Sequence, residues 1–212
     1  MTMFSYESRF SQALLKLCYG CWLNLLWMIC SLPVVTAGAA TAALYTASFK
    51  IVDDHDSNIT RVFFKAFKEN FAQATRIWLI LLATGILLGL DGYVVMHMRA
   101  AVSGTMAVIW TLNLALLICA AVIFTIILMY VFPLIAMVVN NDRAMLKNSL
   151  LIGIRYLFCS IVVFAIHFAM FYAVVAVFTP LIIFGEGICA LLSSYLMINV
   201  IRVCSYIPED EK

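Results

Sequence analysis

Long, unbroken runs of apolar residues dominate the pattern of this chain, and polar residues collect between them. The pattern predicts six apolar helical segments, at about residues 14–32, 36–52, 75–97, 104–139, 153–178 and 181–203. About 20 helical residues cross the hydrocarbon core of a bilayer, so the second segment is short for a full crossing. The fourth is too long for a simple crossing, and we expect it to tilt, to kink at Pro133 or to extend beyond the membrane. The runs do not alternate as the strands of a membrane β-barrel do.

The composition indicates that lipid rather than water solvates this chain. Of its 212 residues, 66% are hydrophobic and 11% are charged, whereas a soluble domain carries about a quarter charged residues. A backbone in lipid must satisfy its own hydrogen bonds, which long apolar runs do as helices. We therefore predict an all-α, polytopic membrane protein with about six transmembrane helices, whose single transmembrane domain fills residues 1–212.

Basic residues divide unequally between the two sides that six crossings create. Only Arg99 falls on the side opposite the two termini. The other twelve of the thirteen fall on the side of the termini: Arg9, Lys16, Lys50, Arg61, Lys65, Lys68, Arg76, Arg143, Lys147, Arg155, Arg202 and Lys212. Because cytoplasmic loops carry an excess of Lys and Arg, we predict a multi-pass protein with both termini in the cytoplasm. A second segment that turned back without crossing would break this parity.

The first two segments are expected to form a helical hairpin. Pro33 removes a backbone donor and disfavours helix at the residue before it, so the break is placed there. Small residues then recur every four positions along the return helix, in the two stripes Gly38, Ala42, Thr46 and Ala39, Ala43, Ala47. Such stripes let helix backbones approach closely in lipid. The alternative is a run of good helix formers without a special partner.

A charged stretch from Thr60 onward is amphipathic. One face carries Phe63, Phe67, Phe71 and Ala74, and another carries Arg61, Lys65, Lys68 and Arg76. This pattern predicts a helix at the cytoplasmic surface, with its aromatic side chains in the acyl boundary and its basic side chains toward phosphates. Arg61, Lys65 and Lys68 either anchor the helix to lipid or dock a cytoplasmic partner such as an ATPase. Farther on, residues 140–142 form a turn signal from which the fourth and fifth segments could project as a cytoplasmic hairpin.

Polar residues inside the apolar segments are the candidates for function, because they are costly in lipid. His167 could relay protons or bind a ligand, or it could be a neutral histidine hydrogen-bonded to a neighbouring helix. Near the outer face, Asp91, His97, Arg99 and Glu186 fall at similar predicted depth. They suggest either a polar mouth for a solute or an ion pair of Arg99 with Asp91 or Glu186. Three asparagines are expected to hold helices together: Asn24, Asn113 and Asn199.

Enzyme motifs are absent from the sequence, which contains no His-Glu-x-x-His, Gly-x-Ser-x-Gly or phosphate-binding Gly-rich loop. We expect no enzyme activity, no cofactor and no metal. Cys18 and Cys21 have redox spacing but no second pair, and His55 among three aspartates is expected to be a solvated loop. We expect no cleavage of a signal peptide after the first segment, because its apolar core is longer than usual.

Several stretches together resemble one known family. They are SLPVVTAGAATAALY after an Asn24-x-x-Trp27 helix, then FFKAFKENF, and later FPLIAMV with Lys147-Asn148-Ser149-Leu150. They resemble the YesL-like family of bacterial integral membrane proteins, a family whose function is unknown. At residues 39–40 this chain has Ala-Ala where Gly-Pro-Ala is commoner, so the start of that helix is expected to be softer.

The resemblance implies a function in a bacterial cell membrane, because family members are typically encoded beside ATP-driven carbohydrate uptake systems. The expected function is a non-enzymatic accessory or regulatory component of such uptake, with the lipid bilayer and subunits of an ABC-type sugar transporter as partners and no nucleic acid. The first alternative is a substrate-binding membrane subunit energised by a separate ATPase. The second alternative is an intramembrane enzyme. The resemblance supplies no catalytic residues.

Overall fold

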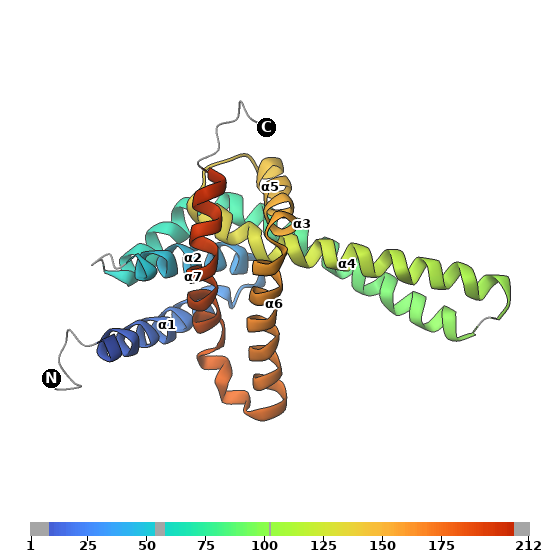
Figure 1. Cartoon of the computed structure of the whole chain (residues 1–212), viewed down its shortest axis with the longest axis horizontal. Helices are drawn as coiled ribbons and strands as arrows, with labels where there is room; N and C mark the ends of the chain where they lie inside the picture. Colours follow the sequence, from blue (N-terminus) through green and yellow to red (C-terminus); the bar gives the residue numbers. More distant parts are fainter. Residues whose placement is uncertain (1–8, 54–57, 102, 206–212) are drawn as a thin grey trace.

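The computed structural model describes residues 9–53, 58–101 and 103–205, and every regular element in these ranges is helical. The α-helices are α1 (Arg9–Ser31), α2 (Ala37–Val52), α3 (Ile59–Ala101), α4 (Thr105–Met137), α5 (Asp142–Arg155), α6 (Leu157–Tyr172) and α7 (Gly185–Ser205). Short 3-10 turns cover Val34–Thr36 and Thr179–Ile183, and a π-helical turn, Ala173–Val177, follows α6. Figure 1 shows their arrangement.

The predicted membrane segments are confirmed as helices. Six helical stretches are long and apolar enough to cross a bilayer: Leu14–Ser31, Val34–Val52, Ile59–Arg99, Thr105–Met137, Leu157–Val177 and Gly185–Cys204. A backbone in lipid is stable in helices, because all their hydrogen bonds are internal. Six such helices in one chain indicate a multi-pass membrane protein.

Helix α2 lies at the centre of the molecule, in contact with α1, α3, α4 and α7. Ala39, Ala43 and Ala47 are fully buried, and Gly38 is buried as well. A Cβ atom on Gly38 would lie 2.7 Å from the Ala74 carbonyl oxygen of α3. These four small residues therefore lie inside the protein, and Gly38 brings the backbone of α2 close to that of α3.

The break between the first two helices occurs where Pro33 predicts it. Helix α1 ends at Ser31, and a 3-10 turn precedes α2. The two helices then pack against each other, with Trp27 Nε1 donating to Thr41 Oγ1 over 3.0 Å. The hairpin is thus formed by a turn and an interhelical hydrogen bond.

The charged stretch after Thr60 differs from its prediction in one respect. It is helical and amphipathic, but it forms the first half of the 43-residue helix α3 and continues into the third apolar segment without a break. Its aromatic face does not point to lipid throughout, because Phe63 is fully buried in the protein core and Phe67 packs against that core. Stacking of Phe63 on Phe67 and edge contact of Phe67 with Phe71 confirm that the three rings share a face.

The second half of α3 and the first part of α4 form a two-helix arm, which we define as residues 79–101 and 105–128. Figure 1 shows this arm extending away from the rest of the molecule. Its tip includes Gly104, whose φ of +70° favours glycine. Pro133 lies within the 33-residue helix α4, close to where α4 rejoins the other helices. We call α1, α2, residues 59–78 of α3, residues 129–137 of α4 and α5 the body.

The predicted fifth segment is divided in two. Helix α5 ends at Arg155 and α6 begins at Leu157, with Tyr156 between them in a non-helical conformation (φ −111°, ψ 50°). The turn predicted at residues 140–142 is confirmed, since the Asn141 side chain accepts from the Asp142 backbone N–H over 2.8 Å at the start of α5. Helix α5 packs back along α4, and α6 pairs with α7 across the direction of the arm (Figure 1).

Candidate functional site

The structure brings together two of the predicted polar residues, His167 of α6 and Glu186 of α7. His167 Nε2 lies 3.9 Å from Glu186 Oε1, and both side chains are about 30% exposed, at 28% and 31%. His167 Nδ1 lies 2.9 Å from the Val163 carbonyl oxygen one turn earlier in the same helix, so this nitrogen carries the proton and donates. The other ring nitrogen therefore faces the carboxyl group.

This pair can hold a charge or a proton within an apolar part of the chain. The distance between His167 Nε2 and Glu186 Oε1 is longer than a hydrogen bond. A protonated His167 would form an ion pair with the Glu186 carboxylate, whereas a neutral His167 would not. Polar pairs at such positions in membrane helices are candidates for binding or proton transfer. One interpretation of the sequence had His167 hydrogen-bonded to a neighbouring helix. In the structure its hydrogen bond stays within α6, and its neighbour on α7 is the Glu186 carboxyl group.

Helix α1 fixes the start of α7 and therefore the position of Glu186. The fully buried Asn24 accepts from the Gly187 backbone N–H over 2.9 Å and donates to the Ile182 carbonyl oxygen over 3.0 Å. A Cβ atom on Gly187 would lie 2.1 Å from the Gly20 carbonyl oxygen, so only glycine permits this approach of α1 and α7. Asn24 therefore joins helices as predicted.

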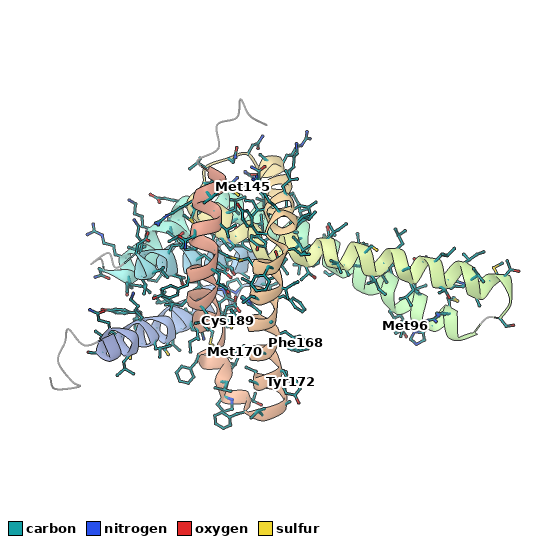
Figure 2. All side chains as sticks on the ribbon, in the orientation of Figure 1. Met96, Met145, Phe168, Met170, Tyr172 and Cys189 are labelled. Carbon is teal, nitrogen blue, oxygen red and sulfur yellow. The ribbon has the colours of Figure 1, made fainter. Side chains whose placement is uncertain are left out.

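The other residues predicted near the outer face lie on the arm, away from Glu186. Asp91, His97 and Arg99 are exposed on the second half of α3, in the arm. His97 Nδ1 lies 2.9 Å from the Tyr93 carbonyl oxygen, and its ring lies 4.1 Å from that of Tyr93. Figure 2 labels Met96 on the arm and Met170 of α6 and Cys189 of α7 well away from it. The predicted grouping of Glu186 with Asp91 and Arg99 is not found, because similar depth does not fix lateral position.

The basic face of α3 is open to its surroundings. Arg61, Lys65 and Lys68 are exposed in the body. Lys65 Nζ lies 3.8 Å from Glu69 Oε1 one turn on, an exposed pair that contributes little stability. The three cations can therefore meet phosphate groups or an acidic protein surface, which are the two uses predicted for them.

One polar contact was not predicted, and it joins α3 to α5. Arg76 Nε donates to Asp142 Oδ2 over 3.0 Å, and Gln73 Nε2 donates to Asp142 Oδ1 over 3.1 Å and to the Asn140 carbonyl oxygen over 2.7 Å. The hydrogen bond from Arg76 holds the pKa of the Asp142 carboxyl below its usual range. In the sequence, only the opposite charges of Arg76 and Asp142 could have indicated this contact, and they lie 66 residues apart.

A second unpredicted contact ties α4 to the break between α5 and α6. The Ser160 hydroxyl donates to the Gly153 carbonyl oxygen over 2.8 Å and lies 2.9 Å from the buried Tyr130 hydroxyl. Tyr130 therefore donates to Ser160. This contact satisfies a carbonyl group that the break at Tyr156 would otherwise leave without its helical partner.

The cysteines and the acidic loop add no site among the described residues. All seven cysteines are free thiols, and no group of three or more His, Cys, Asp or Glu side chains in the described ranges could hold a metal ion. Asp53 forms an ion pair with Arg202 at the end of α7. The rest of the predicted loop around His55 lies outside the described residues.

Comparisons with known proteins identify related sequences of unknown function. Residues 21–92 match the family described as "Protein of unknown function, DUF624". Over 168 residues the chain is 26% identical to the uncharacterized protein YteU of Bacillus subtilis, covering 77% of this chain and 71% of that protein. No solved structure matches. The resemblance to a YesL-like family of bacterial membrane proteins is therefore confirmed, and the matched residues run from α1 through α2 into the arm.

Proposed function

We propose that this protein is a non-enzymatic accessory or regulatory component of ATP-driven carbohydrate uptake in a bacterial cell membrane, with both termini in the cytoplasm. The family resemblance supports this proposal through the transport systems beside which its members are encoded. The observation that carries it is the exposed basic face of α3, Arg61, Lys65 and Lys68. This face lies on the half of α3 that packs against the buried helix α2, which suits it to hold a partner in one orientation.

The partner in this proposal is an ABC-type sugar transporter, bound through an acidic surface of a cytoplasmic subunit. Three cations within two turns of one helix attract a surface of opposite charge and set the rate and specificity of its association. A second group of three exposed basic residues in the body lies on α5: Arg143, Lys147 and Arg155.

The proposal is tested by gentle solubilisation and affinity capture of the tagged protein from its own host. We expect capture of an ATPase subunit of an ABC transporter, identified by mass spectrometry, and slower growth of a deletion strain on particular single sugars. Charge reversal at Arg61, Lys65 and Lys68 to Glu should abolish capture, whereas the same reversal at Arg143, Lys147 and Arg155 should leave it. Normal growth of the deletion strain on every sugar tested, with capture of no transporter subunit, would contradict the proposal.

A second candidate function is a substrate-binding membrane subunit that is energised by a separate ATPase. The His167–Glu186 pair favours it, because polar groups between membrane helices commonly orient a bound solute. Native mass spectrometry of the purified protein would test it. A bound solute that is lost in Glu186→Gln and kept in Glu69→Gln, a matched change on α3, would favour this function over the first.

A further inference from the structure

Helix α5 has one face in the protein and one face open to its surroundings. The buried residues lie on one side of the helix, which packs mainly on α4: Met145, Ser149, Ile152 and Gly153. The exposed residues lie on the opposite side, mostly three or four positions apart: Arg143, Lys147, Leu151, Ile154 and Arg155. Because residues three and four apart are neighbours on a helix, these five side chains form one continuous surface, which we call the α5 face.

The α5 face carries positive charge that the described part of the chain does not neutralise. Arg143, Lys147 and Arg155 form no ion pair with any described residue. Asp142 is the only acidic residue of α5, and its carboxylate is bonded to Arg76 of α3. Like charges four residues apart on a helix repel each other, so an anion from outside the chain would stabilise Arg143 and Lys147.

Apolar side chains share the α5 face with these cations. Leu151 and Ile154 are both more than half exposed. The exposed apolar surface continues past the end of α5, since Leu157 is also more than half exposed and Phe158 is 82% exposed at the start of α6. A helix surface that combines basic and apolar residues is typical of the boundary between water and lipid, where cations contact headgroups and apolar side chains enter the acyl region.

The neighbours of α5 place its face at such a boundary. Two apolar stretches long enough to cross a bilayer adjoin it: Leu157–Val177, which begins just after α5, and Gly185–Cys204 of α7. The side chain of Tyr156, between α5 and α6, lies beside that of Cys204. One stretch therefore begins at the level where the other ends, and α5 lies just beyond this level, in contact with α7 (Figure 1).

Arg155 lies at the transition from the polar helix to the apolar one. Its guanidinium carbon is 6.0 Å from the centre of the Tyr156 ring. Tyrosine is enriched where membrane helices reach the headgroups, and arginine can keep its apolar stem beside apolar groups while its charge reaches water or phosphate. Arg155 and Tyr156 therefore suit the level of the lipid phosphate groups.

We propose that the α5 face binds the phosphate groups of anionic phospholipids through its three cations, with Leu151 and Ile154 beside the acyl chains. The occupant is lipid because the exposed cations are continuous with the exposed apolar surface of α6. The basic face of α3 differs, since Lys65 has an exposed acidic neighbour, Glu69, at 3.8 Å. The α5 face binds lipid whether or not the basic face of α3 holds a transporter subunit.

The test measures lipid binding to the purified and delipidated protein in detergent micelles, with native mass spectrometry as the readout. The probes are phosphatidylglycerol, which is anionic, and phosphatidylcholine, which has no net charge. One variant neutralises the α5 face by combining Arg143→Gln, Lys147→Gln and Arg155→Gln. The matched control on α3 combines Arg61→Gln, Lys65→Gln and Lys68→Gln. All six side chains are exposed, so we expect both variants to fold.

The α5 variant should bind phosphatidylglycerol about tenfold or more weakly than the unaltered protein, because each cation beside an anionic lipid surface contributes about fivefold. Its binding of phosphatidylcholine should change by less than about twofold, because that lipid offers no net charge to the cations. The α3 variant should bind both lipids as the unaltered protein does. Inorganic phosphate should not displace phosphatidylglycerol, because it lacks acyl chains to contact Leu151 and Ile154.

The inference is overturned if the α5 variant keeps the affinity of the unaltered protein for phosphatidylglycerol. An equal loss in the two variants would also overturn it, because that result indicates general attraction between opposite charges. Displacement by inorganic phosphate would instead assign the α5 face to a soluble anion. If the triple variant does not accumulate, Lys147→Gln is compared with Lys65→Gln, and only Lys147→Gln should lose about fivefold in affinity for phosphatidylglycerol.

Discussion

Helix α2 touches four other helices, and at Gly38 it leaves no room for a larger side chain. In the arm, by contrast, α3 and α4 pack on each other through Gly85 against Phe124 and Gly92 against Leu117, while Gly89 has no atom within 4 Å of an added Cβ. Both regions are helical and apolar. Because lipid can cover an apolar surface, we expect close protein packing to matter most where several helices hold a fixed arrangement, as around α2.

Polar contacts follow the same division. In the body and at its border, Asn24, Tyr130 and Asp142 join separate helices. In the arm, the threonine hydroxyls of Thr84, Thr111 and Thr125 each donate to a carbonyl group one turn back in their own helix. We therefore expect matched substitutions to be costly in the body and mild in the arm.

The largest effect is expected for Gly38→Leu. An added Cβ would lie 2.5 Å from Trp78 Cβ and 2.7 Å from the Ala74 carbonyl oxygen, so α2 and α3 must separate. We expect a loss of about 3 kcal/mol in the free energy of unfolding, at the upper end for overpacked cores. The control Gly89→Leu should leave the midpoint of thermal unfolding in detergent unchanged or raise it, because leucine favours helix. Equal midpoints for the two variants would contradict the comparison.

A smaller effect is expected for Asn24→Leu. It leaves the buried Gly187 N–H and Ile182 carbonyl groups without the partner that Asn24 provides. A loss of about 2 kcal/mol follows from the usual cost of such groups. Thr111→Val in the arm removes a hydroxyl that bonds within its own helix and should cost little. Urea or SDS titration of both variants measures the difference, and a loss in Thr111→Val as large as in Asn24→Leu would show that the arm depends on polar contacts too.

Tyr130→Phe should cost about 1 kcal/mol, the usual net value of one hydrogen bond. The variant removes the donor to Ser160 but leaves Ser160 bonded to the Gly153 carbonyl group. Tyr93→Phe is the matched change in the arm, where the tyrosine is 65% exposed. The two midpoints of thermal unfolding, measured in the same detergent, should differ in this order. The prediction fails if the arm variant is the less stable one.

The smallest effect is expected for Asp142→Asn, which removes the partner of Arg76. Arg76 is 62% exposed, so the pair should contribute less than about 1 kcal/mol and lose part of this at high salt. Because the pKa of Asp142 is lowered in the folded protein, its contribution is present above the unfolded pKa of about 4 and is lost as the pH falls through the lower folded value. The stability difference between the two proteins should therefore be constant near neutral pH and vanish in acid. A difference that grows below pH 4 would contradict this assignment.

The sequence predicted the features that depend on local chemistry. The break at Pro33, the small-residue face of α2 and the turn at residues 140–142 follow from residues close together in the chain, and all three are found. The sequence did not predict that α3 is one continuous helix. The amphipathic pattern of residues 61–76 is typical of a separate surface helix, whereas in the structure this stretch packs against α2 and part of its aromatic face is buried.

Features that depend on lateral neighbours could not be predicted. Depth along each helix placed Glu186 near Asp91 and Arg99, whereas the fold places it beside His167. The break at Tyr156 also has no proline or glycine signal at its own position. It depends on the approach of α5 to α4, where a Cβ on Gly153 would lie 2.2 Å from Ile126 Cγ2, and on the hydrogen bond from Ser160.

The uninterrupted helix α3 connects the body to the tip of the arm. A helix of 43 residues measures about 64 Å. Its first half presents Lys65 and its last turn presents Arg99, and the helix is unbroken between them. A tilt of about 5° at the near end therefore moves the far end by about 5 Å, given that length. Because no break separates the two halves of α3, a partner that tilts the helix at Lys65 would also displace the tip of the arm.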